Sequence, residues 1–216
     1  MNKDKLDKKT VCKILDELRN RYPEAKCELD HVNAFELLVA TILSAQTTDK
    51  NVNKVTPRLF ANYKTPYDFL SLSQEELEGI IKEIGLYRNK AKNILLMCRQ
   101  LIERHNGEVP SSMEELTELA GVGRKTANVV LSNAFGIPAL AVDTHVFRVS
   151  NRIGLANSNN VENTEIQLMN NIPREDWSEA HHLLIWHGRR TCEARKPKCE
   201  ICPISEYCDY FAGGKK

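Results

Sequence analysis

Residues 119–127 read Leu-Ala-Gly-Val-Gly-Arg-Lys-Thr-Ala, and apolar residues with helical spacing lie on both sides of this stretch. Glycine adopts backbone angles that other residues avoid, so Gly121 and Gly123 allow two helices to join through a tight hairpin. Amides at the start of the second helix would attract an anion such as a phosphate diester. The glycines alone are equally consistent with an ordinary turn between two helices.

Helical periodicity also dominates the rest of the chain. Apolar residues within 11–18 recur at the spacing of one helix face, and residues 34–43 are apolar nearly all round, which is typical of a buried helix. Further helices are predicted over 52–60, 91–102, 129–134 and 180–186. The sequence therefore predicts an all-α fold of about ten helices.

Two more helix starts are marked by capping boxes, in which side chains satisfy the unpaired amides of the first turn. Ser73 with Glu76 fits this pattern, and so does Ser111 with Glu114. We expect a helix to begin after each serine.

Composition limits the class of protein. The 216 residues suffice for one large domain or two small ones, and 42% hydrophobic with 27% charged residues excludes a fibre or a disordered chain. Thirty Lys and Arg against 29 Asp and Glu leave a net charge of +1, so a basic binding surface would need uneven placement of charge. Residues 1–15 lack a secretory signal, and no apolar run approaches the ~18 residues of a membrane span. We expect a cytoplasmic protein without a membrane partner.

Two residues near the hairpin suit a nucleophile and its electrostatic partner. Lys125 lies in the first turn of the second helix, whose positive end should lower the lysine pKa and favour the neutral amine. Asp143 is predicted to cap a helix that runs to residue 153, although 139–149 alternates weakly as a strand would. A capping carboxylate that faced the amine would stabilise positive charge on a sugar that loses its base. Each residue has a plainer alternative, because lysine can simply pair with phosphate and aspartate can simply cap.

Seven cysteines are present, and four of them fall within residues 192–208. Disulfides are rare in a reducing cytosol, so these four predict a metal ion or cluster. Four thiolates suit tetrahedral zinc and a four-iron cluster equally well, and their spacing matches neither the usual zinc finger nor the ferredoxin run. The remaining Cys12, Cys27 and Cys98 lie on or near apolar faces and are expected in the core.

In combination, these motifs resemble the endonuclease III family. The resemblance rests on residues 119–127, on Asp143 and on the four cysteines Cys192, Cys199, Cys202 and Cys208, and it extends over residues 34–208. Members of this family are DNA glycosylases with AP-lyase activity in the helix-hairpin-helix, Gly/Pro-rich, Asp superfamily. The resemblance implies that the four cysteines hold a [4Fe–4S] cluster. It also implies that the partner is duplex DNA with a damaged base or an abasic site.

The resemblance further implies a role for each reactive residue. Lys125 would attack the C1′ carbon of a damaged nucleotide, displace the base and form a Schiff base that leads to strand cleavage by β-elimination. A lysine nucleophile needs a depressed pKa, as its place at the helix start would provide. Asp143 would assist departure of the base and activation of the amine. Relatives that excise adenine opposite an oxidised guanine generally lack this lysine, so Lys125 favours the bifunctional class.

Excision at C1′ requires the nucleotide to leave the base stack, which leaves a hole in the duplex. By resemblance, Gln46 in the polar loop 44–49 would fill the hole, and Leu86 beside Gly85 would act as an apolar wedge. Without the resemblance, Gln46 is only a polar loop residue and Leu86 is better explained as a core contact.

Further DNA contacts are expected at the hairpin, near the reacting sugar, and on a basic loop that the cluster would pin at both ends. The residues in these three places are Gly121, Gly123, Arg124, Thr126, His145, Arg195, Lys196 and Lys198. His145 also has an alternative role as a local hydrogen-bond partner, and a basic loop is also found on simply solvated surfaces.

We expect two helical domains. Residues 27–137 would form a helical barrel domain that contains the hairpin, and residues 1–26 with 138–216 would form a discontinuous iron–sulfur domain. The cleft between them would bring Lys125 and Asp143 together. The predicted activity is excision of oxidised pyrimidines by a monomer associated with the nucleoid, followed by cleavage 3′ to the abasic site. The alternatives are a monofunctional glycosylase for mismatched thymine or uracil and a non-catalytic module that binds damaged DNA.

Overall fold

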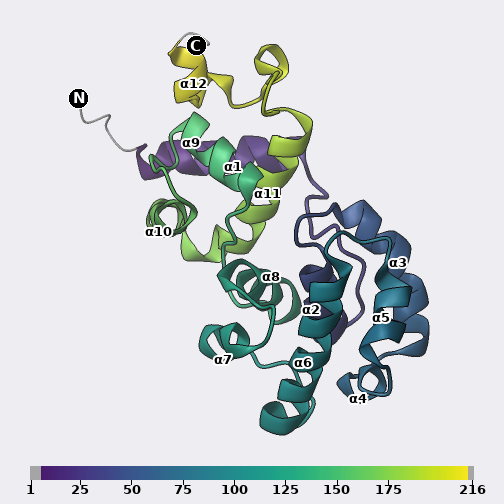
Figure 1. The fold of residues 1–216 in the computed structure, drawn as a ribbon. Helices are drawn as coiled ribbons and strands as arrows, with labels where there is room; N and C mark the ends of the chain where they lie inside the picture. The colour runs from purple at the N-terminus through teal and green to yellow at the C-terminus, as the bar shows by residue number, and fades with distance from the viewer. Residues whose placement is uncertain (1–5, 214–216) are drawn as a thin grey trace. The chain divides into compact units, whose positions relative to one another are not determined.

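The computed structural model describes residues 6–213 (Figure 1). Within this range it contains twelve α-helices, three short 3₁₀ helices and no strand, which confirms the predicted all-α fold. The chain divides into two compact units. We call residues 27–137 the central unit, and residues 1–26 with 138–216 the terminal unit.

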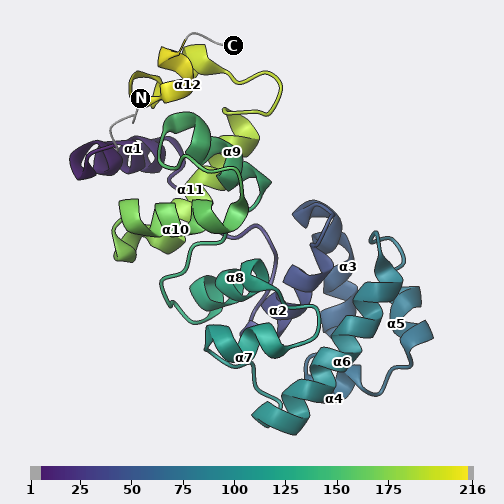
Figure 2. The same cartoon turned by 60° about the vertical axis from the view of Figure 1, so that its left-hand side comes forward.

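The central unit is built around α2 (Ala34–Leu43), which packs against α3, α6 and α8 (Figure 2). Every residue of α2 from Phe35 to Leu43 is buried, as its nearly continuous apolar sequence predicts. The side chain of Asn33 caps this helix by accepting from the Glu36 amide, and the Glu36 carboxylate accepts from the Val32 amide. The other helices of the unit are α3 (Asp49–Asn62), α4 (Pro66–Phe69), α5 (Gln74–Ile81), α6 (Tyr87–His105), α7 (Met113–Glu118) and α8 (Arg124–Ala134).

The terminal unit joins the N-terminal helix to the C-terminal third of the chain. Here α11 (Trp177–Arg190) packs against both α9 (Thr144–Ile153) and α1 (Lys8–Arg21). Arg19 of α1 forms ion pairs with Asp176 and Glu179 at 2.6 and 2.8 Å, which fixes α1 on this unit. The remaining elements are α10 (Val161–Asn171), η1 (Arg174–Asp176), η2 (Cys199–Ile201), η3 (Ser205–Tyr207) and α12 (Asp209–Ala212).

Local predictions held at some helix starts and failed at one. The capping box of Ser73 and Glu76 is confirmed, with both reciprocal bonds present. The predicted box at Ser111 is wrong, because Ser112 is the cap and its side chain accepts from the Glu115 amide. Two adjacent serines make the sequence pattern ambiguous by one residue.

The three cysteines outside the C-terminal group do not share one environment. Cys98 is buried as predicted and Cys27 is half-buried, but Cys12 is exposed, which corrects its assignment to the core. The buried stripe of α1 consists of Val11, Ile14, Leu15 and Leu18. Cys12 is rotated by about 100° from Val11, which turns it away from that stripe.

None of the helices within residues 6–213 combines the length and the apolar character that crossing a membrane requires.

Candidate functional site

The hairpin connects α7 to α8 in the central unit. Leu119 is the C-cap that follows α7, and its carbonyl accepts a hydrogen bond of 3.1 Å from the Val122 amide. Gly121 has a φ of +78°, and a Cβ there would lie 3.0 Å from the Cβ of Asn93, so glycine is required at this position. Gly123 differs, because its φ of −94° is ordinary and a Cβ would meet nothing within 4 Å. The second glycine therefore leaves open space beside the backbone.

This open space lies at the start of α8. Gly123 is the N-cap, and no side chain caps the helix. The N-cap of α8 thus supplies no side-chain acceptor, unlike the N-cap of most helices, and an uncapped helix start is the arrangement of an anion site. Lys125 is the second residue of α8 and is exposed, Arg124 before it is also exposed, and Thr126 is half-buried.

Asp143 caps α9 in the terminal unit, which confirms the predicted helix start. Its Oδ1 accepts from the amides of His145 and Val146, each at 2.8 Å. Its Oδ2 receives no hydrogen bond from the described part of the chain. A half-buried carboxylate is therefore held rigidly through one oxygen and keeps the other oxygen for a further interaction. Asp143 and Lys125 belong to different units, and their pairing stays a prediction.

The side chain of His145 lies beside Arg148, whose Nη2 is 3.2 Å from the imidazole Nδ1. Burial lowers the pKa of His145, and the nearby Asp143 opposes this shift. The imidazole also hydrogen-bonds to the backbone of Gly188, and this bond, like Asp143, raises the pKa of His145. His145 is thus a local hydrogen-bond partner of Arg148 and of the Gly188 backbone.

Gln46 and Leu86 share an unusual backbone conformation in the central unit. Their φ values are +56° and +59°, and within residues 6–213 Asn106 is the only other residue besides glycine in this region. The Leu86 side chain is 54% exposed, which excludes the alternative that it is a core contact. Gln46 is exposed in a turn that is closed by a 3.1 Å bond from the Thr47 amide to the Ser44 carbonyl. Exposed residues in a costly conformation are typical of functional sites.

The four C-terminal cysteines line one small pocket in the terminal unit. Within residues 6–213, no three His, Cys, Asp or Glu side chains lie close enough together to hold a single metal ion. Four cysteine thiols around one pocket are the donor set that an iron–sulfur cluster uses. The residues concerned are Cys192, Cys199, Cys202 and Cys208.

Polar groups surround these thiols. Arg152 Nη1 lies 3.5 Å from Cys192 Sγ, and the imidazole Nε2 of His187 lies 3.6 Å from Cys202 Sγ. Burial and the neighbouring cysteines raise the pKa of Cys202 to about 11. Holding this sulfur as a thiolate therefore requires a strong positive charge, such as bound iron supplies.

Two arginines that the sequence analysis missed pin the segment around Cys192. Arg148 donates to the carbonyls of Cys192 and Gly188, and Arg152 donates to those of Glu193 and Ala194. Both arginines lie on α9, one helix turn apart, and their spacing was the only signal in the sequence.

The basic loop presents its charges unequally. Arg195 and Lys196 are exposed. Lys198 is half-exposed, but its Nζ pairs with Glu193 at 2.7 Å and donates to the Arg190 carbonyl at 3.0 Å. Arg195 and Lys196 are therefore better placed for phosphate than Lys198.

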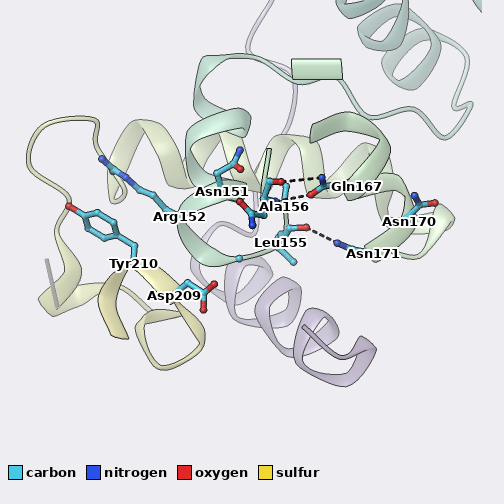
Figure 3. Close-up of a pocket in the computed structure, with 11 residues that line it drawn as sticks. Asn151, Arg152, Leu155, Ala156, Gln167, Asn170, Asn171, Asp209 and Tyr210 are labelled. Atoms are coloured by element: carbon cyan, nitrogen blue, oxygen red, sulfur yellow. Dashed lines mark hydrogen bonds between the residues drawn. The ribbon is translucent and has the colours of Figure 1, made fainter. Parts of the chain in front are cut away.

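A separate pocket of the terminal unit lies between α9, α10 and α12, and no predicted site residue lines it (Figure 3). Its amide side chains serve the fold: Gln167 bonds the backbone of Asn157 through both its oxygen and its nitrogen, and Asn171 donates to the Leu155 carbonyl. The guanidinium of Arg152 lies 4.8 Å from the ring centre of Tyr210 on its rim. This pocket is explained by local structure.

Comparisons with known proteins cover nearly the whole chain. Residues 39–174 match the family model described as HhH-GPD superfamily base excision DNA repair protein, and residues 192–208 match that of the iron-sulfur binding domain of endonuclease III. Endonuclease III of Bacillus subtilis is 52% identical over 204 residues, which span 94% of this chain and 93% of that protein.

Solved structures show the same similarity. A trapped covalent intermediate of endonuclease III with DNA has a TM-score of 0.92 at 51% identity and covers 98% of this chain and 100% of its own. A thermostable thymine-DNA glycosylase has a TM-score of 0.86 at 28% identity and covers 95% of this chain and 98% of its own.

Proposed function

Because this chain belongs to the endonuclease III family of the HhH-GPD superfamily of base-excision DNA repair proteins, we infer that it is a bifunctional DNA glycosylase and AP lyase. Its substrate is duplex DNA that carries an oxidised pyrimidine or an abasic site. It acts as a monomer in the cytoplasm, on nucleoid DNA. The observation that carries this function is Lys125, an exposed amine in the first turn of the hairpin helix α8.

The reaction begins with attack by the Nζ of Lys125. This nitrogen forms a bond to C1′ while the bond from C1′ to the base breaks, and the departing base takes the electron pair. Opening of the sugar ring gives a Schiff base, which acidifies C2′. Loss of a C2′ proton then expels the 3′ phosphate by β-elimination, and hydrolysis returns the free amine.

Asp143 stabilises the positive charge that develops on the sugar as the base leaves. Two backbone amides fix Oδ1, so the charge of the free Oδ2 is preorganised rather than solvated. The central and terminal units are the two domains of the enzyme; Lys125 belongs to the first and Asp143 to the second.

DNA is held by phosphate contacts and by insertion into the stack. The uncapped amides of α8 and the open space at Gly123 receive a phosphate, with Gly121, Arg124 and Thr126 beside them. Gln46 and Leu86 enter the duplex where the damaged nucleotide has left. His145, Arg195, Lys196 and Lys198 contribute from the terminal unit.

The chain carries a [4Fe–4S] cluster, and we propose Cys192, Cys199, Cys202 and Cys208 as its ligands. When bound, the cluster supplies the positive charge that keeps these thiolates ionised and fixes the basic loop. Every step of base removal is carried out by the side chains named above.

Borohydride trapping on a duplex with one thymine glycol tests this function. The holoenzyme should give a covalent adduct and a nicked strand without alkali, and Lys125→Ala should give neither. Lys64→Ala, at another exposed lysine of the central unit, is the matched control and should behave as wild type. An adduct that survives Lys125→Ala would refute the assignment.

The monofunctional alternative rests on the similarity to a thymine-DNA glycosylase. It requires base release from mismatched thymine or uracil with strand cleavage only after alkali. The non-catalytic alternative requires binding to abasic DNA without turnover of any lesion.

Asp143→Asn separates the catalytic carboxylate from the helix cap. Asparagine is an equally good cap, so the free energy of unfolding should change by less than about 0.5 kcal/mol. Loss of the charge should slow single-turnover base release by about 100-fold or more. A normal rate in Asp143→Asn would show that the carboxylate only caps the helix.

A further inference from the structure

Lys90 is a buried lysine that no step of the proposed reaction uses. It lies in the first turn of α6, and only 4% of its surface is exposed. Its Nζ donates to the carbonyls of Leu43 and Ala45, at 2.8 and 2.7 Å. Burial lowers its pKa. Because a buried ammonium is costly, these two bonds must serve a purpose that a leucine or methionine could not.

The two carbonyls lie at the end of α2 and just beyond it. The last carbonyls of a helix have no partner within the helix, and the helix dipole makes this end attractive to a cation. The dipole of α6 itself disfavours a cation in its first turn, which is where the backbone of Lys90 lies. The placement of Lys90 therefore benefits the end of α2 and not its own helix.

Lys90 forms hydrogen bonds with the backbone at or next to both predicted insertion residues, Gln46 and Leu86. Ala45 immediately precedes Gln46 in the turn after α2, and the Lys90 side chain holds the Ala45 carbonyl. The Lys90 amide donates to the Leu86 carbonyl at 3.1 Å. One residue thus ties the Gln46 turn, through its side chain, to the Leu86 helix start, through its backbone.

Gln46 and Leu86 both need such support. Their positive φ angles cost free energy and persist only where the surroundings fix them. Both side chains are exposed, so packing of the side chains themselves does not hold the conformation.

We propose that Lys90 is a positioning residue that sets the spacing of the Gln46 turn and the Leu86 helix start, so that both side chains enter the duplex together. This inference rests on the proposed function. It assigns Lys90 a part in nucleotide extrusion and none in the chemistry at C1′.

A double-mutant cycle separates this role from general stabilisation of the fold. Lys90→Met keeps the length of the side chain and removes the charge and the donors. It is made in the wild-type holoenzyme and in a Gln46→Ala/Leu86→Ala background. Ile94→Ala, at a fully buried residue one turn further along α6, is the control for lost stability. The readouts are single-turnover release of thymine glycol, melting temperature, and fluorescence of a 2-aminopurine placed opposite the lesion.

Lys90→Met should slow base release about tenfold or more, because small displacements of positioning groups carry large kinetic costs. It should also reduce the rise in 2-aminopurine fluorescence on binding. In the Gln46→Ala/Leu86→Ala background, the same substitution should cost less than about twofold, since the side chains it positions are gone. Ile94→Ala should lower the melting temperature without reducing the fluorescence rise.

Equal losses from Lys90→Met in both backgrounds would overturn the proposal, and so would a wild-type rate and fluorescence. If Lys90→Met does not fold, Lys90→Arg keeps the charge but displaces the donors. A folded Lys90→Arg with a wild-type rate overturns the proposal, and a slowed rate that disappears in the Gln46→Ala/Leu86→Ala background supports it. A wild-type holoenzyme that releases no base would refute the proposed function instead.

Discussion

At the scale of single residues, the hairpin shows that two similar glycines have different tasks. Gly121 is fixed by backbone conformation and by the approach of Asn93. Gly123 has an ordinary conformation and open space around it. The first is needed to make the turn, whereas the second is needed only if a ligand must come close to the helix start.

Serine substitutions should separate these tasks. Gly121→Ser should lower the free energy of unfolding by about 1–2 kcal/mol, because serine is strained at positive φ. Gly123→Ser should leave stability within about 0.5 kcal/mol, because serine is at least as good an N-cap. It should still weaken binding to abasic-site DNA, since the new side chain occupies the space for phosphate and takes up an amide. Denaturant unfolding measures the stability of each variant, and titration with abasic-site DNA measures its binding. Equal losses of stability in Gly121→Ser and Gly123→Ser would contradict the separate tasks of the two glycines.

At the scale of one element, the segment 192–199 is a loop that is fixed by hydrogen bonds and an ion pair within the terminal unit. Arg148 and Arg152 of α9 hold the carbonyls at its start, and the pair of Lys198 with Glu193 closes it. The exposed charges between these anchors belong to Arg195 and Lys196. The loop thus exposes the charges of Arg195 and Lys196 while its backbone is held in place on both sides of them.

The salt dependence of DNA binding measures these charges. Arg195→Gln and Lys196→Gln should each reduce the slope of log K against log salt by about one unit, because each would remove one proposed phosphate contact. Lys198→Gln should reduce it less, since Glu193 already neutralises that charge. A larger change for Lys198 than for Arg195 would contradict the geometry of the loop.

At the scale of the whole molecule, each unit has its own buried core. The central unit is organised around α2, and the terminal unit around the contacts of α11 with α9 and α1. Cys192 and Cys208, two of the proposed cluster ligands, belong to the core of the terminal unit. Loss of the cluster should therefore affect the two units differently.

Hydrogen exchange after removal of iron tests this difference. Amides of α9 and α11 should lose protection, because metal binding contributes to folding where its ligands are part of a core. Amides of α2 and α8 should keep theirs, because all four proposed cluster ligands lie in the terminal unit. The holoenzyme under the same conditions is the control, and uniform loss of protection would refute independent stability of the central unit.

The sequence predicted what depends on local pattern. The hairpin, the Asp143 cap and the buried α2 follow from residue spacing and capping chemistry alone. The all-α class of the fold follows from the helical periodicity of the apolar residues. The sequence did not predict α10, which is largely polar, or the four-residue helices α4 and α12, which are too short to show a period.

Long-range contacts of polar residues were also missed. Lys90 bonds carbonyls 45 and 47 residues away, and Arg148 reaches a carbonyl 44 residues away. A lysine or arginine in a helix pattern predicts a solvated face, and only tertiary structure shows that its head group is enclosed.

The pairing of α1 with α11 has a consequence for synthesis on the ribosome. The ion pairs of Arg19 join residues separated by about 160 positions, so α1 emerges long before its partner helix exists. At ~5–20 residues per second, the wait is on the order of ten seconds or more. During it the apolar stripe of Val11, Ile14, Leu15 and Leu18 is uncovered. The nascent chain therefore passes through an interval in which this stripe is a target for chaperones, while residues 27–137 can already collapse.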